Sequence, residues 1–228
     1  HGQLPQIQRD RMGLISPFPF LSPLKTAAAA LRRFSLAKGT RMGYDNSIQM
    51  EKTPSERMIT MAFREISVEQ LKDNPFTLIN KDWMLITAGN QESHNTMTAS
   101  WGGVGELWGK YVSTIYIRPQ RYTLEFLERE DTYSLCFFNP EYRPALNLCG
   151  SKSGRDVDKD KETGLTPCFD QAAPYYQEAR LVLICRKLYK QDLAEESFLD
   201  REIFEKCYPN RDLHRMFIGE IVKVLEKA

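Results

Sequence analysis

The sequence predicts a mainly β fold, in which a closed or partly closed β-barrel carries a few added helices. One observation is a set of six segments rich in β-branched and aromatic residues. Another is that the helical patterns between them do not alternate regularly with strands, as a doubly wound parallel sheet would require. The length of 228 residues suits one large domain with an extension better than two full domains.

Strands are expected at 83–88, 94–101, 111–117, 132–138, 181–190 and 216–225. Ser67 and Gln70 stand at capping-box spacing, which predicts a helix over 68–74 that the following proline ends. Apolar residues recur at helical spacing in 123–130 and in 194–207, and each segment is therefore expected to form a helix.

The glycine-rich run at 102–109 calls for a separate interpretation. It resembles part of a dinucleotide-binding fingerprint, but Trp108 stands where the third glycine of GxGxxG belongs. A Rossmann fold is therefore disfavoured.

Composition excludes several functional classes. The chain has 31 Lys+Arg and 30 Asp+Glu, and a net charge of +1 supplies no global reason to bind nucleic acid. No run of about 18 apolar residues occurs, so neither a membrane-spanning helix nor a membrane partner is expected. The five cysteines are odd in number without a CxxC pair and only three histidines occur, which disfavours a metal site and indicates reduced thiols in the cytoplasm.

The near-neutral total conceals a basic N-terminal segment. Up to Tyr44 there are seven Lys and Arg residues against one acidic residue, a charge of +6, which leaves −5 for the remainder. Residues 1–60 are expected to be a basic N-terminal extension, either an arm, a tail or a mis-assigned start, with a targeting peptide less favoured. Residues 61–228 are expected to form the single compact domain.

The segment NTMTASW at 95–101 is dominated by small and hydroxylated residues. Such a strand lets its backbone N–H and C=O groups approach a flat heteroaromatic ligand closely, with Trp101 as one wall. The alternative is an edge strand that runs into a glycine-rich turn.

The segment IRPQRYT at 117–123 ends a strand and opens a helix. Arg118 and Arg121 could clamp an anion, with Thr123 and neighbouring amides as further donors, and phosphate is the natural guest. The alternative is that both arginines pair with surface carboxylates such as Glu125.

The segment 150–165 is a dense, charged loop, with Lys152, Arg155 and Lys159 set among serines and Gly154. It lacks the GxxxxGK[ST] motif, but serines and cations around a glycine would suit a phosphate nest. The alternative is a solvated charged loop.

His214 lies just before the last expected strand. Its imidazole could donate a hydrogen bond or a proton to a substrate, with Asp212 orienting the ring, although a structural role is the alternative. His94 adjoins the small-residue strand and is assigned no chemistry. No GxSxG motif occurs, so a hydrolase is disfavoured.

The sequence contains five motifs in this order: Trp83, NTMTASWGGVG, IRPQRYT, SLCFFNPEYRPALNLCGSKSGRDVDK and DLHRMFIGEI. Together they resemble the flavin reductase-like family, from about Phe63 to the C-terminus. They look closest to its flavoredoxin and NAD(P)H:FMN oxidoreductase branch. The resemblance implies an FMN-binding split β-barrel, Greek-key-like and homodimeric, with FMN near the subunit interface. Members begin near the position of Phe63, so the basic segment has no counterpart.

The resemblance implies an FMN-dependent oxidoreductase that passes a hydride from NADH or NADPH to flavin, with electrons going on to free flavin or another acceptor. The alternative is a flavoredoxin-type electron-transfer protein, which holds FMN tightly, has no nicotinamide turnover and serves a redox protein partner. A third possibility is a flavin- or haem-binding storage or sensor protein without redox turnover.

The resemblance also assigns residues. FMN is expected along the strand Asn95, Thr96, Met97, Thr98, Ala99, Ser100 and Trp101 and at the phosphate-side residues Arg118, Arg121 and Thr123. The loop Ser151, Lys152, Ser153, Gly154 and Arg155 is expected to close over the FMN tail or the nicotinamide. His214 is expected to be the catalytic residue, placing the nicotinamide or supplying a proton.

Overall fold

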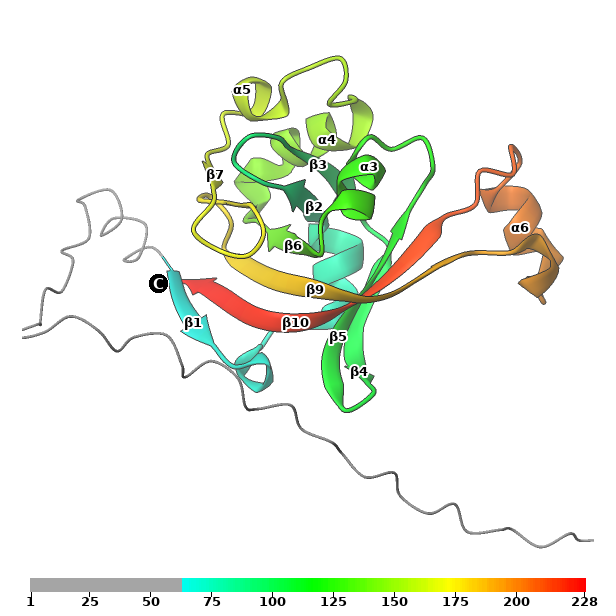
Figure 1. Cartoon of the computed structure of the whole chain (residues 1–228), viewed down its shortest axis with the longest axis horizontal. Coiled ribbons are helices and arrows are strands. Elements are labelled where there is room, and N and C mark those ends of the chain that lie inside the picture. The colour runs from blue at the N-terminus through cyan, green and yellow to red at the C-terminus, as the bar shows by residue number, and fades with distance from the viewer. Residues whose placement is uncertain (1–62) are drawn as a thin grey trace, which may run out of the picture. The chain divides into compact units, whose positions relative to one another are not determined.

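The computed structural model describes residues 63–228, and the predicted extension at 1–60 lies outside them (Figure 1). The strands are β1 (Phe63–Ile66), β2 (Met84–Gly89), β3 (His94–Ala99), β4 (Gly102–Leu107), β5 (Lys110–Ile117), β6 (Thr132–Phe137), β7 (Pro167–Cys168), β8 (Tyr175–Tyr176), β9 (Leu181–Asp192) and β10 (Arg215–Lys227). One antiparallel sheet has the order β3-β2-β6-β9-β10-β5-β4, with β1 also paired to β10, and β7 pairs with β8.

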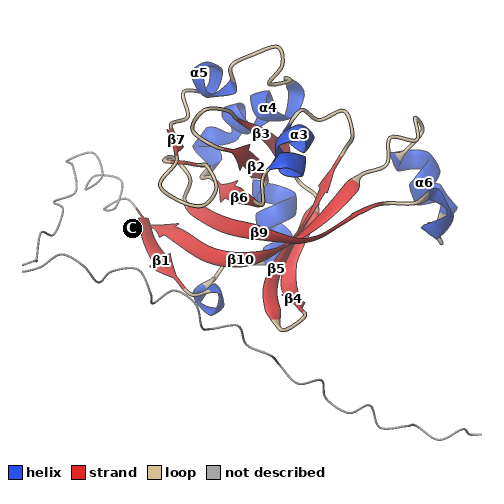
Figure 2. Cartoon of the chain, viewed as in Figure 1, coloured by secondary structure: helices blue, strands red, loops and turns tan. Residues whose placement is uncertain are grey.

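The helices are short and lie around the sheet (Figure 2). The α-helices are α2 (Pro75–Thr77), α3 (Thr123–Arg129), α4 (Arg143–Ser151), α5 (Lys159–Thr163) and α6 (Arg201–Cys207). The remaining turns are η1 (Val68–Gln70), η2 (Leu78–Asp82), η3 (Pro140–Tyr142) and η4 (Glu195–Ser197). Helices α3 and α4 pack on β2 and β3. Helix α6 lies apart from them, at the far end of β9 and β10 (Figure 1). Within residues 63–228, no helix has the length and apolar character needed to cross a membrane.

The mainly β prediction is confirmed, and a strand occurs in each of the six expected segments. The prediction of a helix over 68–74 is wrong, because only the turn η1 forms and Leu71 is already extended. Pro75 disfavours helical geometry for the residue before it, and η1 buries no side chain that could stabilise a longer helix. The helix expected over 194–207 is divided into η4 and α6.

Two apolar clusters hold the described residues together. One lies among the strands and α3 and contains Ile86, Leu135 and Leu183, whereas the other lies under α4, β7 and β8 and contains Leu85 and Val182. Successive residues of β2 therefore enter different clusters, as the alternation of side chains in a strand requires. Burial on both faces explains why this strand reads as a continuous apolar run rather than as an alternating one.

Strand β10 organises the sheet because it pairs with β1, β5 and β9. Its register against β9 shifts at Ile218/Gly219, and such irregularities bend a strand. A Cβ atom on Gly219 would lie 2.5 Å from the hydroxyl of Tyr133, which is fully buried and 2.7 Å from Ser113 Oγ. The buried hydroxyl pair thus requires a glycine at this point of β10.

Replacing Gly219 with Ala should lower the free energy of unfolding by about 1–3 kcal/mol, because an added methyl forces a well-packed core to shift. Urea unfolding followed by circular dichroism measures this loss. Gly103→Ala is the matched control, since no atom lies within 4 Å of a Cβ built there. Equal destabilisation by the two substitutions would contradict the packing argument.

Candidate functional site

The turn between β2 and β3 determines where the candidate site begins. Asn90 Oδ1 accepts hydrogen bonds from the backbone amides of Glu92 (2.9 Å) and Ser93 (3.0 Å). Gly89 has φ +126°, and a Cβ there would lie 2.3 Å from the Ser93 carbonyl oxygen. Asparagine and glycine therefore shape this turn, and β3 starts at His94 along one edge of the sheet.

A cavity of about 170 Å³, called here the central cavity, lies beside β3. The three segments singled out in the sequence converge on it, from β3, from the start of α3 and from the loop after α4. Of the predicted site residues, its wall contains Asn95, Met97, Arg121, Thr123, Ser151, Lys152, Ser153 and Gly154. It also contains Gln120, Tyr122 and Lys159, which were not among them.

Close contacts lock these segments together. Asn95 is buried, and its Nδ2 donates to Thr123 Oγ1 at 2.7 Å. A Cβ on Gly154 would lie 1.9 Å from Asn95 Oδ1 and 3.2 Å from the Tyr122 ring. Only glycine allows the 150–165 loop to approach β3 this closely, which accounts for the glycine in the predicted phosphate nest.

Two cations in the cavity wall are held by backbone carbonyls. Arg121 Nη1 donates to Gly150 O at 2.6 Å, and Lys159 Nζ donates to Thr96 O at 2.7 Å and to Cys149 O at 2.9 Å. Neither side chain makes an ion pair with a carboxylate of residues 63–228. Lys159 is only 7% exposed, and burial is the largest effect and lowers its pKa. Cys149 opposes this lowering, and the charge of Arg121 adds a smaller lowering effect.

A buried cation without a counterion is costly, and this cost disappears when an anion binds beside it. Arg121 and Lys159 therefore give the central cavity the electrostatics of an anion site. Within residues 63–228 there is no cluster of three His, Cys, Asp or Glu side chains that could hold a metal ion.

Two predicted arginines are engaged elsewhere. Arg118 donates to Asp212 Oδ2 (2.5 Å) and to Cys207 O (2.8 Å), and its guanidinium lies 5.2 Å from the centroid of the Tyr208 ring. Arg155 pairs with Glu125 and stacks on Tyr122. The structure thus brings Arg121 to the central cavity and gives Arg118 and Arg155 carboxylate partners.

The other predicted residues of β3 have separate surroundings. Thr96 Oγ1 bonds to Thr87 Oγ1 at 2.9 Å inside the sheet, and Thr98 Oγ1 donates to Leu146 O of α4 at 2.5 Å. Ala99 packs against the cluster among the strands. Ser100 and Trp101 line a more apolar cavity of about 410 Å³ beyond the end of β3, together with Phe76, which is 82% exposed.

His214 is buried in an aromatic environment. Its Nδ1 lies 2.8 Å from the Tyr208 hydroxyl, and its ring centroid is 5.4 Å from that of Trp101. Burial, together with a smaller effect of the positive charge of Arg118, lowers the pKa of His214 to about 4. The ring is therefore uncharged at neutral pH, and it lies in the wall of neither cavity described above.

The expectation that Asp212 orients the His214 ring is wrong. The Asp212 carboxylate accepts from Arg118 and from Gln120 Nε2 (2.9 Å), while the Tyr208 hydroxyl takes the position beside the imidazole. A guanidinium binds a carboxylate more strongly than a neutral imidazole does, and it holds Asp212 away from the ring.

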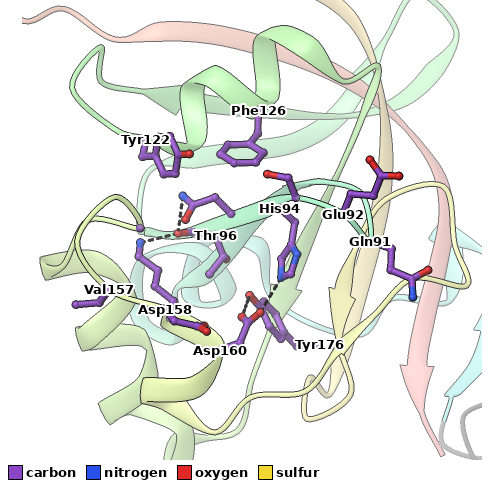
Figure 3. A pocket seen from close by; sticks show the side chains of 14 residues that line it. Gln91, Glu92, His94, Thr96, Tyr122, Phe126, Val157, Asp158, Asp160 and Tyr176 are labelled. Atoms are coloured by element: carbon purple, nitrogen blue, oxygen red, sulfur yellow. Dashed lines mark hydrogen bonds and ion pairs between the residues drawn. The ribbon is translucent and has the colours of Figure 1, made fainter.

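A second cavity of about 370 Å³ adjoins the central cavity and shares Asn95, Tyr122, Gly154 and Lys159 with it (Figure 3). Its wall contains a hydrogen-bonded group of His94, Asp160 and Tyr176. The sequence assigns no chemistry to these residues, because their meeting depends on packing between β3, α5 and β8. Lys159 was visible only as one of several loop cations.

Comparisons with known proteins agree with this architecture. The family model described as "Flavin reductase like domain" matches residues 77–228. No curated protein matches the chain.

Among solved structures, an FMN-binding domain of a flavin reductases-like enzyme from Shewanella baltica is 16% identical, with a TM-score of 0.52 over 72% of this chain and 76% of that one. An FMN-binding protein from Thermus thermophilus is 20% identical, with a TM-score of 0.50 over 72% and 80%. A flavin reductase with a split barrel domain from Shewanella frigidimarina, described as putative, is 21% identical, with a TM-score of 0.50 over 68% and 75%. These likenesses show the split-barrel fold, and the family match shows that the chain belongs to the flavin reductase-like domain family.

Proposed function

We propose that this chain binds FMN with its phosphate in the central cavity and is an NAD(P)H-dependent flavin reductase. The observation that carries the proposal is the pair Arg121 and Lys159, two cations without a carboxylate partner among residues 63–228 beside a cavity. A phosphate ester is the dianion that such a pair favours. The names of the structural neighbours, which describe FMN-binding proteins, support flavin as the rest of the ligand.

The residues present fit this ligand. Thr123, Ser151 and Ser153 would add neutral donors to the phosphate, and Gly154 allows the loop to close over it. Met97 and the backbone along β3 toward Ser100 and Trp101 would hold the flavin ring and its ribityl chain, since small side chains leave the strand accessible. Bound FMN would supply hydride acceptance and electron transfer that no amino-acid side chain provides.

His214 is proposed as the residue that places the nicotinamide, through its neighbour Trp101. Because burial lowers its pKa to about 4, the ring is a neutral hydrogen-bonding group at pH 7 rather than a proton donor. Tyr208 fixes the ring through Nδ1, so that Nε2 keeps a constant direction. Arg118 and Arg155 act from outside the central cavity in this arrangement, by supporting Tyr208 and Tyr122.

A second copy of the chain is the proposed neighbour of the apolar cavity at Ser100 and Trp101. Phe76 is 82% exposed and Trp101 is 49% exposed, and large apolar groups gathered on one surface are typical of an interface. We therefore propose a homodimer of the 61–228 domain.

The proposed final electron acceptor is a redox protein or free flavin. The proposed location is the cytoplasm, since the five free thiols suit a reducing compartment.

An anaerobic absorbance titration tests the proposed reaction. Protein loaded with FMN is mixed with NADH and then with NADPH, while the visible absorption of the flavin is followed. We expect rapid bleaching by at least one of the two nucleotides. Bound FMN that is bleached only by dithionite would instead favour a flavoredoxin-type electron carrier, and a failure to bind FMN would contradict both functions.

A further inference from the structure

Asp160 connects three separate elements through its carboxylate (Figure 3). Its Oδ2 lies 2.7 Å from His94 Nε2 on β3, and its Oδ1 accepts a hydrogen bond from the Tyr176 hydroxyl on β8 at 2.8 Å. Tyr176 is fully buried, and the Phe169 ring lies edge-on to His94 at 5.1 Å. Both carboxylate oxygens are engaged, so the side chain of Asp160 is fixed relative to β3.

Lys159 precedes Asp160 in the first turn of α5, and it contacts the same strand two residues further along. Its Nζ donates to Thr96 O and to Cys149 O. An ammonium group carries three N–H donors, so one N–H of Lys159 remains for a ligand. Lys159 is part of the wall of the central cavity, where that ligand would lie. Helix α5 is therefore attached to β3 at two points, through His94 and through Thr96.

The position of Lys159 depends on such attachments, because α5 has only five residues and a helix this short is unstable alone. The Lys161 amide donates a hydrogen bond to Asp158 Oδ1 (3.2 Å), which caps the first turn of α5 but does not link α5 to β3. The hydrogen bonds of Asp160 do so. Its negative charge, taken alone, would oppose a nearby phosphate, so any benefit to phosphate binding must come from geometry.

We propose that Asp160 is a positioning residue, which together with His94 and Tyr176 holds Lys159 at the central cavity and so makes the site prefer a phosphorylated flavin to the same flavin without phosphate. This inference rests on the proposed function, because it takes the phosphate of FMN to be the anion beside Lys159. It goes beyond that proposal by assigning a role to a group of residues outside the central cavity.

The test compares the affinities of FMN and riboflavin, measured by flavin fluorescence quenching. The wild type should prefer FMN, and Asp160→Ala should reduce that preference by about tenfold, the loss expected when a charged hydrogen bond to phosphate is misplaced. Asp160→Asn should stay within about twofold of the wild type, because an amide can accept from Tyr176 and donate to the other tautomer of His94. In a Lys159→Met background, Asp160→Ala should have no further effect on the preference.

Glu92→Ala is the matched control, because Glu92 is an exposed carboxylate in the wall of the same second cavity and should leave the preference unchanged. If Asp160→Ala and Asp160→Asn both strengthen FMN binding, Asp160 acts by its charge and the positioning role is wrong. If Asp160→Ala does not fold, His94→Ala replaces it in the test, because it removes the partner of Asp160 Oδ2. His94→Ala must then show the same loss of preference for FMN over riboflavin.

Two results separate this inference from the proposed function. If Lys159→Met abolishes the FMN preference while Asp160→Ala and His94→Ala retain it, the phosphate site stands and the positioning role is overturned. If the wild type binds riboflavin as tightly as FMN, the placement of the phosphate fails, and the role of Asp160 fails with it.

Discussion

Replacing Lys159 with Met should weaken FMN binding by roughly 10- to 150-fold, the equivalent of about 1.5–3 kcal/mol for a lost hydrogen bond to a charged group. Arg121→Met should cause a loss of similar size. Both cations face a cavity without a carboxylate partner among residues 63–228, so a bound phosphate would gain their full attraction. Isothermal titration with FMN measures the change.

Lys161→Met is the control for the Lys159 variant, since it makes the same substitution on an exposed residue of the same helix. Its FMN affinity should remain within about twofold of the wild type, as expected for a solvated charge. The Lys159 variant also leaves two carbonyls without their donor, so its thermal stability and riboflavin affinity must be measured alongside. Unchanged FMN affinity in both the Lys159 and Arg121 variants would exclude a phosphate from the central cavity.

Acidification from pH 7 to pH 4 should destabilise the wild type by about 2–3 kcal/mol more than it destabilises His214→Gln. The ordinary pKa of histidine is 6.5, and burial lowers that of His214 to about 4 in the folded chain. Between these values the unfolded chain binds a proton that the folded chain does not. Stability from this residue is therefore complete above pH 6.5 and is lost as the pH falls toward 4.

Urea unfolding at several pH values measures the effect, and the comparison with His214→Gln removes the contribution of the carboxylates, which titrate in both proteins. Glutamine can retain a hydrogen bond to the Tyr208 hydroxyl, so the variant mainly removes the titrating ring. Parallel stability curves for the two proteins would show that burial does not hold His214 in its neutral form.

Six strands of this fold were predictable from the sequence, because strand formation depends on residue types that lie close together along the chain. The strands β1, β4, β7 and β8 were not predicted, and β4 forms from the glycine-rich segment that was expected to be a turn. The run MLITA of β2 reads as a strand on its β-branched and apolar residues alone. The wrong prediction of a helix over 68–74 shows that a local pattern alone does not ensure a helix. Its capping pattern is present, since Gln70 Oε1 accepts from the Ser67 amide at 2.9 Å, but no packing partner supports a longer helix.

The candidate site was predictable in its segments more than in its individual contacts. Small residues on β3, a strand-to-helix junction with Arg121, and a glycine in a charged loop were visible as separate motifs, and they do meet at the central cavity. The resemblance to a family indicated that they belong together. Nothing in the local pattern distinguished Arg121 from Arg118, because the difference lies in Asp212, a residue about 90 positions away that binds only one of them.

The sequence by itself determined the β-rich fold class, six of the strands and the segments that line the candidate site. Tertiary structure alone decided which charges are buried and which are paired. Lys159 became a buried cation only because α5 packs against β3, and Asp160, His94 and Tyr176 became a network only because three elements meet there. Burial and long-range pairing set the energy of a charge, and neither property is written in the residues next to it.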